Sequence, residues 1–155
     1  MYIRTNPHPQ GKLVGDCVKR ACCLASGINY HDITAMLNRY RKISGGSKFN
    51  SNENWKSFVE EILLGRKDHD DMRYAFYGHR YTVDDYAHYW EDEGMFILRC
   101  SHHLVAAGYG DYFDTWDSGD KGVYMAYAIP NYERIVTHIR KCYPQLCKGL
   151  SLERN

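Results

Sequence analysis

The sequence predicts an α+β domain in which helices come first along the chain and a small antiparallel β-meander follows. Two observations carry this prediction. In the first part of the chain, apolar residues recur with the 3.6-residue period of amphipathic helices. From Gly94 onward they fall instead in short runs separated by turn residues, which is typical of strands. Helices and strands segregated in this way favour an α+β fold over a parallel βαβ fold.

The first predicted helix spans residues 16–26. Gly15 permits a turn before it and Asp16 is a suitable N-cap, so Cys17 should lie in the first turn. Its buried face would consist of small and apolar residues at helical spacing, namely Val18, Ala21, Cys22 and Ala25. Gly27 would end the helix as a C-cap.

The other helices are expected further along the chain. The predicted segments are residues 30–41, residues 54–64, a helix capped by Thr82, and residues 132–142. Residues 42–52 are rich in Gly, Ser and Asn and should form a polar loop. Residues 66–80 are charged and irregular, with a short strand expected at 73–77.

The meander is predicted to contain four consecutive strands. These are residues 95–100, 103–109, 112–116 and 123–129, with turns at 110–111 and 118–120. In the hairpin of the second and third strands, residues 106–108 would face residues 112–113. Asp114 would then lie opposite the early part of the second strand, as a neighbour of His103 on one face of the sheet. The tail at 144–155 is expected to be loosely held.

Length and charge limit the function classes. At 155 residues the chain is expected to form one domain, residues 1–155, because it is long enough to bury a core and shows no linker. Its net charge of +1 gives no sign of nucleic acid or of an anionic membrane as partner. No apolar run approaches the roughly 20 residues of a spanning helix, and no signal peptide is visible. We therefore expect a cytoplasmic protein. The sequence leaves its oligomeric state open.

The six cysteines are expected to be reduced thiols rather than a disulfide framework. Cys22 and Cys23 are adjacent, and Cys142 and Cys147 have no second pair to complete a structural zinc site. The sequence thus predicts neither a metal nor a cofactor.

One cysteine stands in a position that favours chemistry. A thiol in the first turn of a helix feels the positive end of the helix dipole, which favours thiolate. A cysteine nucleophile also needs a base and a group that orients the base. His103 and Asp114 are the candidates, with His102 as the alternative base and Asp117 as the alternative carboxylate. Asp117 precedes a Ser-Gly pair and so is also suited to cap a turn.

The motifs around these residues resemble a family of small papain-like cysteine peptidases, many of them phage-encoded. The resemblance lies in the run Gly-Asp-Cys-Val-Lys-Arg-Ala at residues 15–21 and in residues 82–86, 103–106 and 114–117. More distantly, the chain is similar to bacteriocin-leader peptidases and NlpC-type cell-wall endopeptidases. The resemblance covers the N-terminal helices and the C-terminal sheet, and it marks residues 42–80 as an insertion.

The resemblance implies a papain-like fold and a thiol protease with a catalytic triad. Cys17 would be the nucleophile, His103 the base and Asp114 the orienting carboxylate. The enzyme would be a hydrolase that cleaves a peptide, isopeptide or amide bond of a protein or peptide through a Cys17 thioester. If the protein is phage-encoded, it would act in the host cell cytoplasm. The same triad supports transglutamination or deamidation, and a catalytically silent papain-like module that binds a host or partner protein is the alternative from another class.

Two positions depart from the papain pattern. Papain-type enzymes usually place an oxyanion-hole glutamine shortly before the cysteine, where this chain has Gly11, and Val18 replaces the aromatic residue that usually follows the cysteine. The candidate oxyanion donors are the side chains of Gln10, Asn6 and Lys12. The backbone N–H of the nucleophile itself is a further donor.

Overall fold

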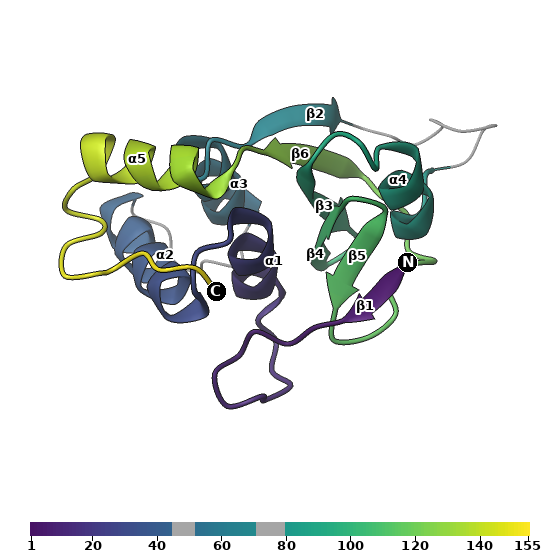
Figure 1. Cartoon of the computed structure of the whole chain (residues 1–155), viewed down its shortest axis with the longest axis horizontal. Coiled ribbons are helices and arrows are strands. Elements are labelled where there is room, and N and C mark those ends of the chain that lie inside the picture. Colours follow the sequence, from purple (N-terminus) through teal and green to yellow (C-terminus); the bar gives the residue numbers. More distant parts are fainter. Residues whose placement is uncertain (45–51, 71–79) are drawn as a thin grey trace.

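The computed structural model describes residues 1–44, 52–70 and 80–155. Within these residues the chain forms five helices and one mixed sheet of six strands (Figure 1). The predicted α+β class is confirmed. The strand expected at 73–77 lies outside the described residues.

The helices largely follow the predicted segments. They are α1 (Cys17–Ser26), α2 (Tyr30–Ser44), α3 (Asn52–Glu61), α4 (Val83–Tyr89) and α5 (Tyr132–Cys142). Helix α1 ends at Gly27, whose positive φ of 81° and bond to the carbonyl of Cys23 make it the expected C-cap. Thr82 caps α4 in a capping box with Asp85.

The sheet differs from a simple meander. Its strands are β1 (Tyr2–Arg4), β2 (Arg66–Asp70), β3 (Met95–Cys100), β4 (His103–Gly108), β5 (Asp111–Asp114) and β6 (Met125–Ile129), in the spatial order β1-β5-β4-β3-β6-β2. β3, β4 and β5 are joined by the predicted hairpins. β6, however, pairs with β3 rather than with β5, and β1 runs parallel to β5. The prediction of an entirely antiparallel meander is therefore wrong, because the segment between β5 and β6 is long enough to cross to the far side of β3.

Two tight turns fix the register of the hairpins. Cys100 pairs with His103, so the β3–β4 turn consists of two residues. The β4–β5 turn is Tyr109-Gly110, one residue earlier than predicted. Both turn residues have positive φ, 56° and 87°, as a type I′ hairpin turn requires.

Two buried clusters cover the two faces of the sheet. Successive strand residues point to opposite faces, so Leu104 packs in the cluster with α1, α2, α3 and α5, and Val105 packs in the cluster with α4. In Figure 1, α1 lies between the strands and α2, and α4 lies on the other side of the sheet. Helix α3 belongs to the first cluster through Trp55, Phe58 and Val59. Part of the segment interpreted as an insertion therefore contributes to the core.

The end of the chain is held firmly, contrary to the loose tail expected at 144–155. Leu146 and Leu152 are 2% and 0% exposed. A guanidinium nitrogen of Arg39 donates to the carbonyls of Leu146 and Lys148 at 2.8 and 2.9 Å, and the Leu152 N–H donates to the Asp32 carboxylate at 2.8 Å. The prediction failed because the two leucines are isolated in the sequence and show no period, although both are buried in the fold.

Candidate active site

Cys17 is the first residue of α1, as predicted, but Asp16 does not cap the helix. Its carboxylate accepts hydrogen bonds from the Arg20 guanidinium and from the Tyr30 hydroxyl, the latter at 2.7 Å. The N–H groups of the first turn are therefore not used by a side-chain cap. The positive end of α1 and the backbone N–H of Cys17 are left to act on the thiol and on a group bound beside it.

His103 and Asp114 meet at the end of the sheet where α1 begins. Ala106 pairs with Phe113, which puts Asp114 opposite Val105 and on the same face as His103. The distance from His103 Nε2 to Asp114 Oδ2 is 2.6 Å. Since Nε2 is taken by the carboxylate, Nδ1 is left for the side-chain hydrogen bond between His103 and Cys17. The structure thus brings Cys17, His103 and Asp114 together, with Cys17 and His103 in the same hollows and His103 bonded to Asp114.

The electrostatics favour a thiolate–imidazolium pair. Burial raises the pKa of the Cys17 thiol, but the hydrogen bonds from His103 and the Leu104 backbone, with the charges of His103 and Arg20, bring that pKa below its ordinary value. Burial lowers the pKa of His103, but the hydrogen bonds to Asp114 and Cys17 raise it to about 9. By contrast, burial raises the pKa of the Cys100 thiol to about 12. Cys17 is therefore set apart chemically from the buried cysteines.

Asp114 is buried and fully engaged. Only 2% of the residue is exposed. Its Oδ2 accepts from His103 and from the Ser118 hydroxyl at 2.7 Å, and its Oδ1 accepts from the Thr115 N–H at 2.8 Å. Burial raises the pKa of this carboxyl group, but the hydrogen bond and charge of His103, with those other donors, lower it overall. Asp114 is therefore held as an anion in a fixed orientation.

Arg20 joins α1 to β5 beneath the site. It is 7% exposed, and it donates to the Asp16 carboxylate and, at 3.4 Å, to Asp114 Oδ1. Neither Arg20 nor Ser118 is given a role by a motif in the sequence. Arg20 did leave a signal, since it lies within one turn of Cys17 in a short helix that is otherwise rich in small and apolar residues. Arginine is rarely buried unless it is paired, so a buried Arg20 implies a carboxylate partner near Cys17. Ser118 had no such signal, since its position depends on the loop after β5.

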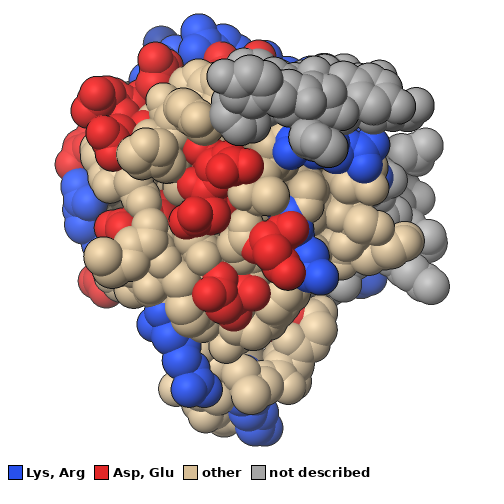
Figure 2. Space-filling view, turned by 90° about the vertical axis from the view of Figure 1, so that its right-hand side faces the viewer, with Lys and Arg blue, Asp and Glu red and all other residues tan. Residues whose placement is uncertain are grey.

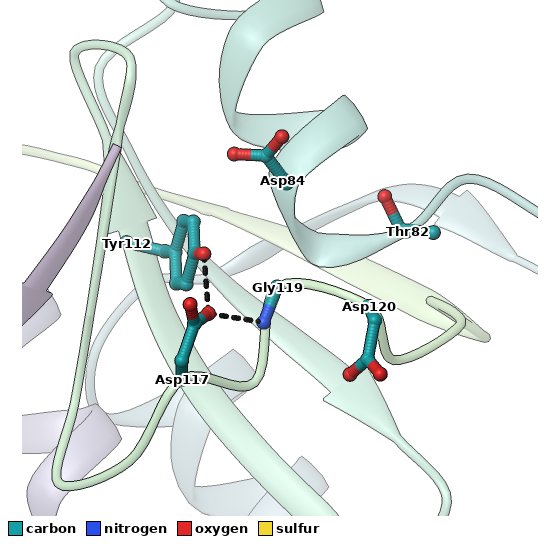
Figure 3. Close-up of a pocket in the computed structure, with 6 residues that line it drawn as sticks. All are labelled: Thr82, Asp84, Tyr112, Asp117, Gly119 and Asp120. Atoms are coloured by element: carbon teal, nitrogen blue, oxygen red, sulfur yellow. Dashed lines mark hydrogen bonds between the residues drawn. The ribbon is translucent and has the colours of Figure 1, made fainter.

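The two alternative residues lie apart from the triad hydrogen bonds. His102 is exposed and belongs to the β3–β4 turn, with φ of 54°, just before the strand that carries His103. Asp117 accepts from the Tyr112 hydroxyl at 2.6 Å and from the Gly119 N–H at 3.0 Å (Figure 3). It caps the turn, as its place before Ser-Gly indicated.

Asp117 faces a separate, acidic hollow. The residues that line it are Thr82, Asp84, Tyr112, Asp117, Gly119 and Asp120 (Figure 3). Acidic side chains also gather near the middle of the molecular face seen in Figure 2. No group of three His, Cys, Asp or Glu residues within the described ranges is arranged to hold a metal ion.

The three candidate oxyanion side chains do not line the hollows at Cys17. The Asn6 amide donates to the Lys12 carbonyl at 3.0 Å, and Asn6 Oδ1 accepts from the His8 N–H. Gln10 lines a different hollow with Tyr30. The donor that remains at the nucleophile is its own backbone N–H, at the start of α1.

Two hollows flank Cys17 and His103, and both also contact Gly15 and His102. The first, here called the Trp116 hollow, is lined by the exposed apolar side chains of Leu13, Val14 and Trp116. The Trp116 ring lies 5.0 Å from the His103 ring, measured between centroids. The second, here called the Arg99 hollow, is lined by Val18, Trp55, Arg99, Cys100 and Leu104. An extended substrate that crossed Cys17 would meet one hollow on each side.

Comparisons of the chain with protein-family models, with curated protein sequences and with solved structures found no match. All six cysteines, each within the described residues, are free thiols. No described helix combines the length and the apolar character needed to cross a membrane.

Proposed function

We propose that the protein is a papain-like cysteine hydrolase that cleaves a peptide, isopeptide or amide bond through a thioester on Cys17. The observation that carries the proposal is that Cys17 and His103 line the same two hollows while His103 binds the buried Asp114 carboxylate at 2.6 Å. Nucleophile, base and orienting group are the three parts that covalent acyl transfer needs. The sequence resemblance at residues 15–21, 103–106 and 114–117 supports the same reading and suggests a phage-encoded enzyme acting in the host cytoplasm.

The proposed reaction has two halves. The Cys17 thiolate attacks the carbonyl carbon, and its backbone N–H donates to the oxygen that becomes negative. The His103 imidazolium then gives its proton to the departing amine, the carbon–nitrogen bond breaks, and a thioester remains. In the second half, neutral His103 takes a proton from water as the water oxygen attacks the thioester. The carbon–sulfur bond breaks, the acid product leaves, and Cys17 and His103 return to thiolate and imidazolium.

Asp114 supports both halves by its charge and its position. Its 2.6 Å contact with Nε2 keeps the ring oriented with Nδ1 toward Cys17. Its negative charge favours the imidazolium form that the leaving amine needs. The buried donors on Asp114 keep the carboxylate in place while His103 changes its protonation state.

The same thioester leads to other products when the reactants differ. If the bond cleaved is a glutamine side-chain amide, the protein is a deamidase when water resolves the thioester and a transglutaminase when an amine does. A silent module would keep the fold and bind a partner without turnover. The exposed apolar side chains of the Trp116 hollow suit a protein or peptide partner in every case.

One assay separates these outcomes. A mixture of defined peptides that contain internal glutamines is incubated with the protein in ¹⁸O-labelled water and a fluorescent primary amine, and products are read by mass spectrometry. New ¹⁸O-labelled chain ends indicate a peptidase, ¹⁸O-labelled glutamates a deamidase, and amine adducts a transglutaminase. We expect labelled chain ends, absent with Cys17→Ala and retained with His102→Ala. Identical product mixtures from the wild-type protein and Cys17→Ala would contradict the hydrolase and favour the binding module.

A further inference from the structure

We propose that the Arg99 hollow is a subsite for a carboxylate of the substrate beside the reacting bond. The inference rests on the proposed function, since it assigns one side of the same site. The carboxylate would belong to an acidic side chain or to a free chain end, which present the same chemistry. The Trp116 hollow exposes three apolar side chains, and the Arg20 cation in its lining is already paired with two carboxylates, so this hollow would take a neutral group.

The sheet directs Arg99 toward the start of α1. Arg99 is paired with Leu104 of β4 and with Met125 of β6. Directly paired residues share a face of the sheet, and both partners belong to the cluster that packs on α1. Arg99 is also next to the end of β3, so its side chain lies at the edge of that cluster, where Cys17 begins the helix. It is half-buried there.

Within the described residues, no carboxylate forms an ion pair with Arg99. Its recorded contact is with the ring of Tyr124, whose centre lies 5.7 Å from the guanidinium carbon, and Arg80 lies closer to the same ring at 3.5 Å. Arg20, also near Cys17, is instead bonded to two carboxylates. A guanidinium presents a fork of N–H donors that matches a carboxylate, and half-burial strengthens such a pair. The fork of Arg99 is therefore available to a ligand.

Most of the other walls of the hollow are apolar. Val18, Trp55, Cys100 and Leu104 are each buried, and His102 and His103 complete the lining beside Cys17. A ligand group in the hollow therefore meets hydrocarbon and sulfur along part of its length, with the Arg99 cation and the His103 imidazolium as charged partners. That arrangement fits a carboxylate on a short apolar stem. An amide of the same size would lose the charge-assisted bonds, and a basic side chain would be repelled.

Arg99 is separable from the nucleophile. The groups that lower the pKa of Cys17 are His103, Leu104 and Arg20, and Arg99 is not among them. A change at Arg99 should therefore alter which reagents reach Cys17 without altering the thiolate itself. This separation allows the subsite and the nucleophile to be tested independently.

The test compares the alkylation rates of Cys17 by iodoacetate and by iodoacetamide, which are similar in size and differ in charge. We expect Arg99→Gln to lower the ratio of the two rates about tenfold while the iodoacetamide rate stays the same; a factor of ten corresponds to one strong charged contact. Arg99→Lys should keep most of the preference and serves if the glutamine variant folds poorly. The matched control is Arg134→Gln, an exposed arginine on α5, which should leave the ratio unchanged.

Short peptides then distinguish the two sources of the carboxylate. Acetyl-Ala-Glu-Ala-amide, acetyl-Ala-Gln-Ala-amide and acetyl-Ala-Gln-Ala with a free end are compared as protectants of Cys17 against iodoacetamide. Protection by the first indicates an acidic side chain, and protection by the third a chain end. An unchanged reagent ratio in Arg99→Gln, with normal iodoacetamide reactivity, would overturn the subsite alone. Iodoacetamide reactivity of Cys17 no higher than that of Cys147 would overturn the subsite and the proposed function together.

Discussion

Asp114 controls the protonation of His103 by its charge as well as by its position. The two side chains meet at 2.6 Å, and the pKa of His103 is raised to about 9. Below that pH the imidazolium is present, and it is lost as pH rises through about 9. The Cys17 thiolate and the His103 imidazolium should therefore be present together between the lowered pKa of the thiol and about pH 9.

The variant Asp114→Asn tests the charge. Asparagine keeps the shape and an acceptor but removes the negative charge, so the pKa of His103 should fall toward its ordinary value of about 6.5. At about pH 8 the imidazolium would then be largely lost, and alkylation of Cys17 by iodoacetamide should slow about tenfold. Asp117→Asn is the matched control, because Asp117 contacts Tyr112 and Gly119 instead. Slowing by the Asp117 variant in place of the Asp114 variant would show that the orienting carboxylate had been wrongly assigned.

At the scale of single residues, most of the candidate triad could be predicted from the sequence. The position of Cys17 in the first turn of a helix followed from Gly15 and Asp16 before it. The closeness of His103 to Asp114 followed from counting residues back from the hairpin turn. The partners of Asp16 were not predictable, because an aspartate before a helix normally caps it. Here Arg20, one helical turn away, and Tyr30 of α2 bind the carboxylate instead, and the contact with Tyr30 forms only when α1 and α2 pack together.

At the scale of elements, Arg20 fastens α1 to the end of β5. Its guanidinium lies between the carboxylates of Asp16 and Asp114, which are 3% and 2% exposed. The same contact fixes the nucleophile helix relative to the orienting carboxylate. The elements of the site are therefore held by a buried ionic network as well as by apolar packing.

Replacing this arginine should destabilise the fold. Arg20→Met removes the cation, which leaves the buried Asp16 carboxylate without a counter-charge and Asp114 with His103 alone, so we expect the free energy of unfolding to fall by about 3 kcal/mol. Urea denaturation measures the change. Arg154→Met is the control, because the ion pair of Arg154 with Glu133 is exposed and should leave the unfolding midpoint nearly unchanged. Equal midpoints for the wild-type protein and Arg20→Met would contradict a structural role for the network.

Elements with strong local signals were predicted well, and those defined by long-range pairing were not. Helix α4 followed from its capping residue, and α5 from its period. By contrast, β1 is three residues long and pairs with β5 across most of the chain. The place of β6 beside β3 likewise depends on which neighbour the connecting segment reaches. Neither choice leaves a periodic pattern in the sequence.

At the scale of the whole molecule, the end of the chain completes the core on the side of α1. Leu152 is fully buried, and its N–H binds the Asp32 carboxylate of α2. We expect Leu152→Ala to lower the free energy of unfolding by about 2 to 4 kcal/mol, because it removes buried methyl groups and leaves a cavity. The comparison is Ile43→Ala, an apolar residue that is 73% exposed. Similar denaturation curves for the two variants would mean that the tail is only loosely associated.

The whole fold also explains why the site is accessible. Helix α1 begins at the end of the sheet where β4 starts and β5 ends, and hollows open on both sides of Cys17. The buried network lies beneath, and exposed apolar side chains and the half-buried Arg99 lie beside Cys17.

The pH dependence of iodoacetamide alkylation, followed for each cysteine by mass spectrometry, tests the central claim most directly. We predict that at about pH 6 Cys17 is alkylated faster than the other five cysteines. The pH at which its alkylation rate rises should lie well below that of the exposed Cys142, because its thiolate is held by His103. His103→Ala should return Cys17 to ordinary thiol behaviour, and His102→Ala should not. A Cys17 profile that coincides with that of Cys142, or one that depends on His102 instead of His103, would contradict the account.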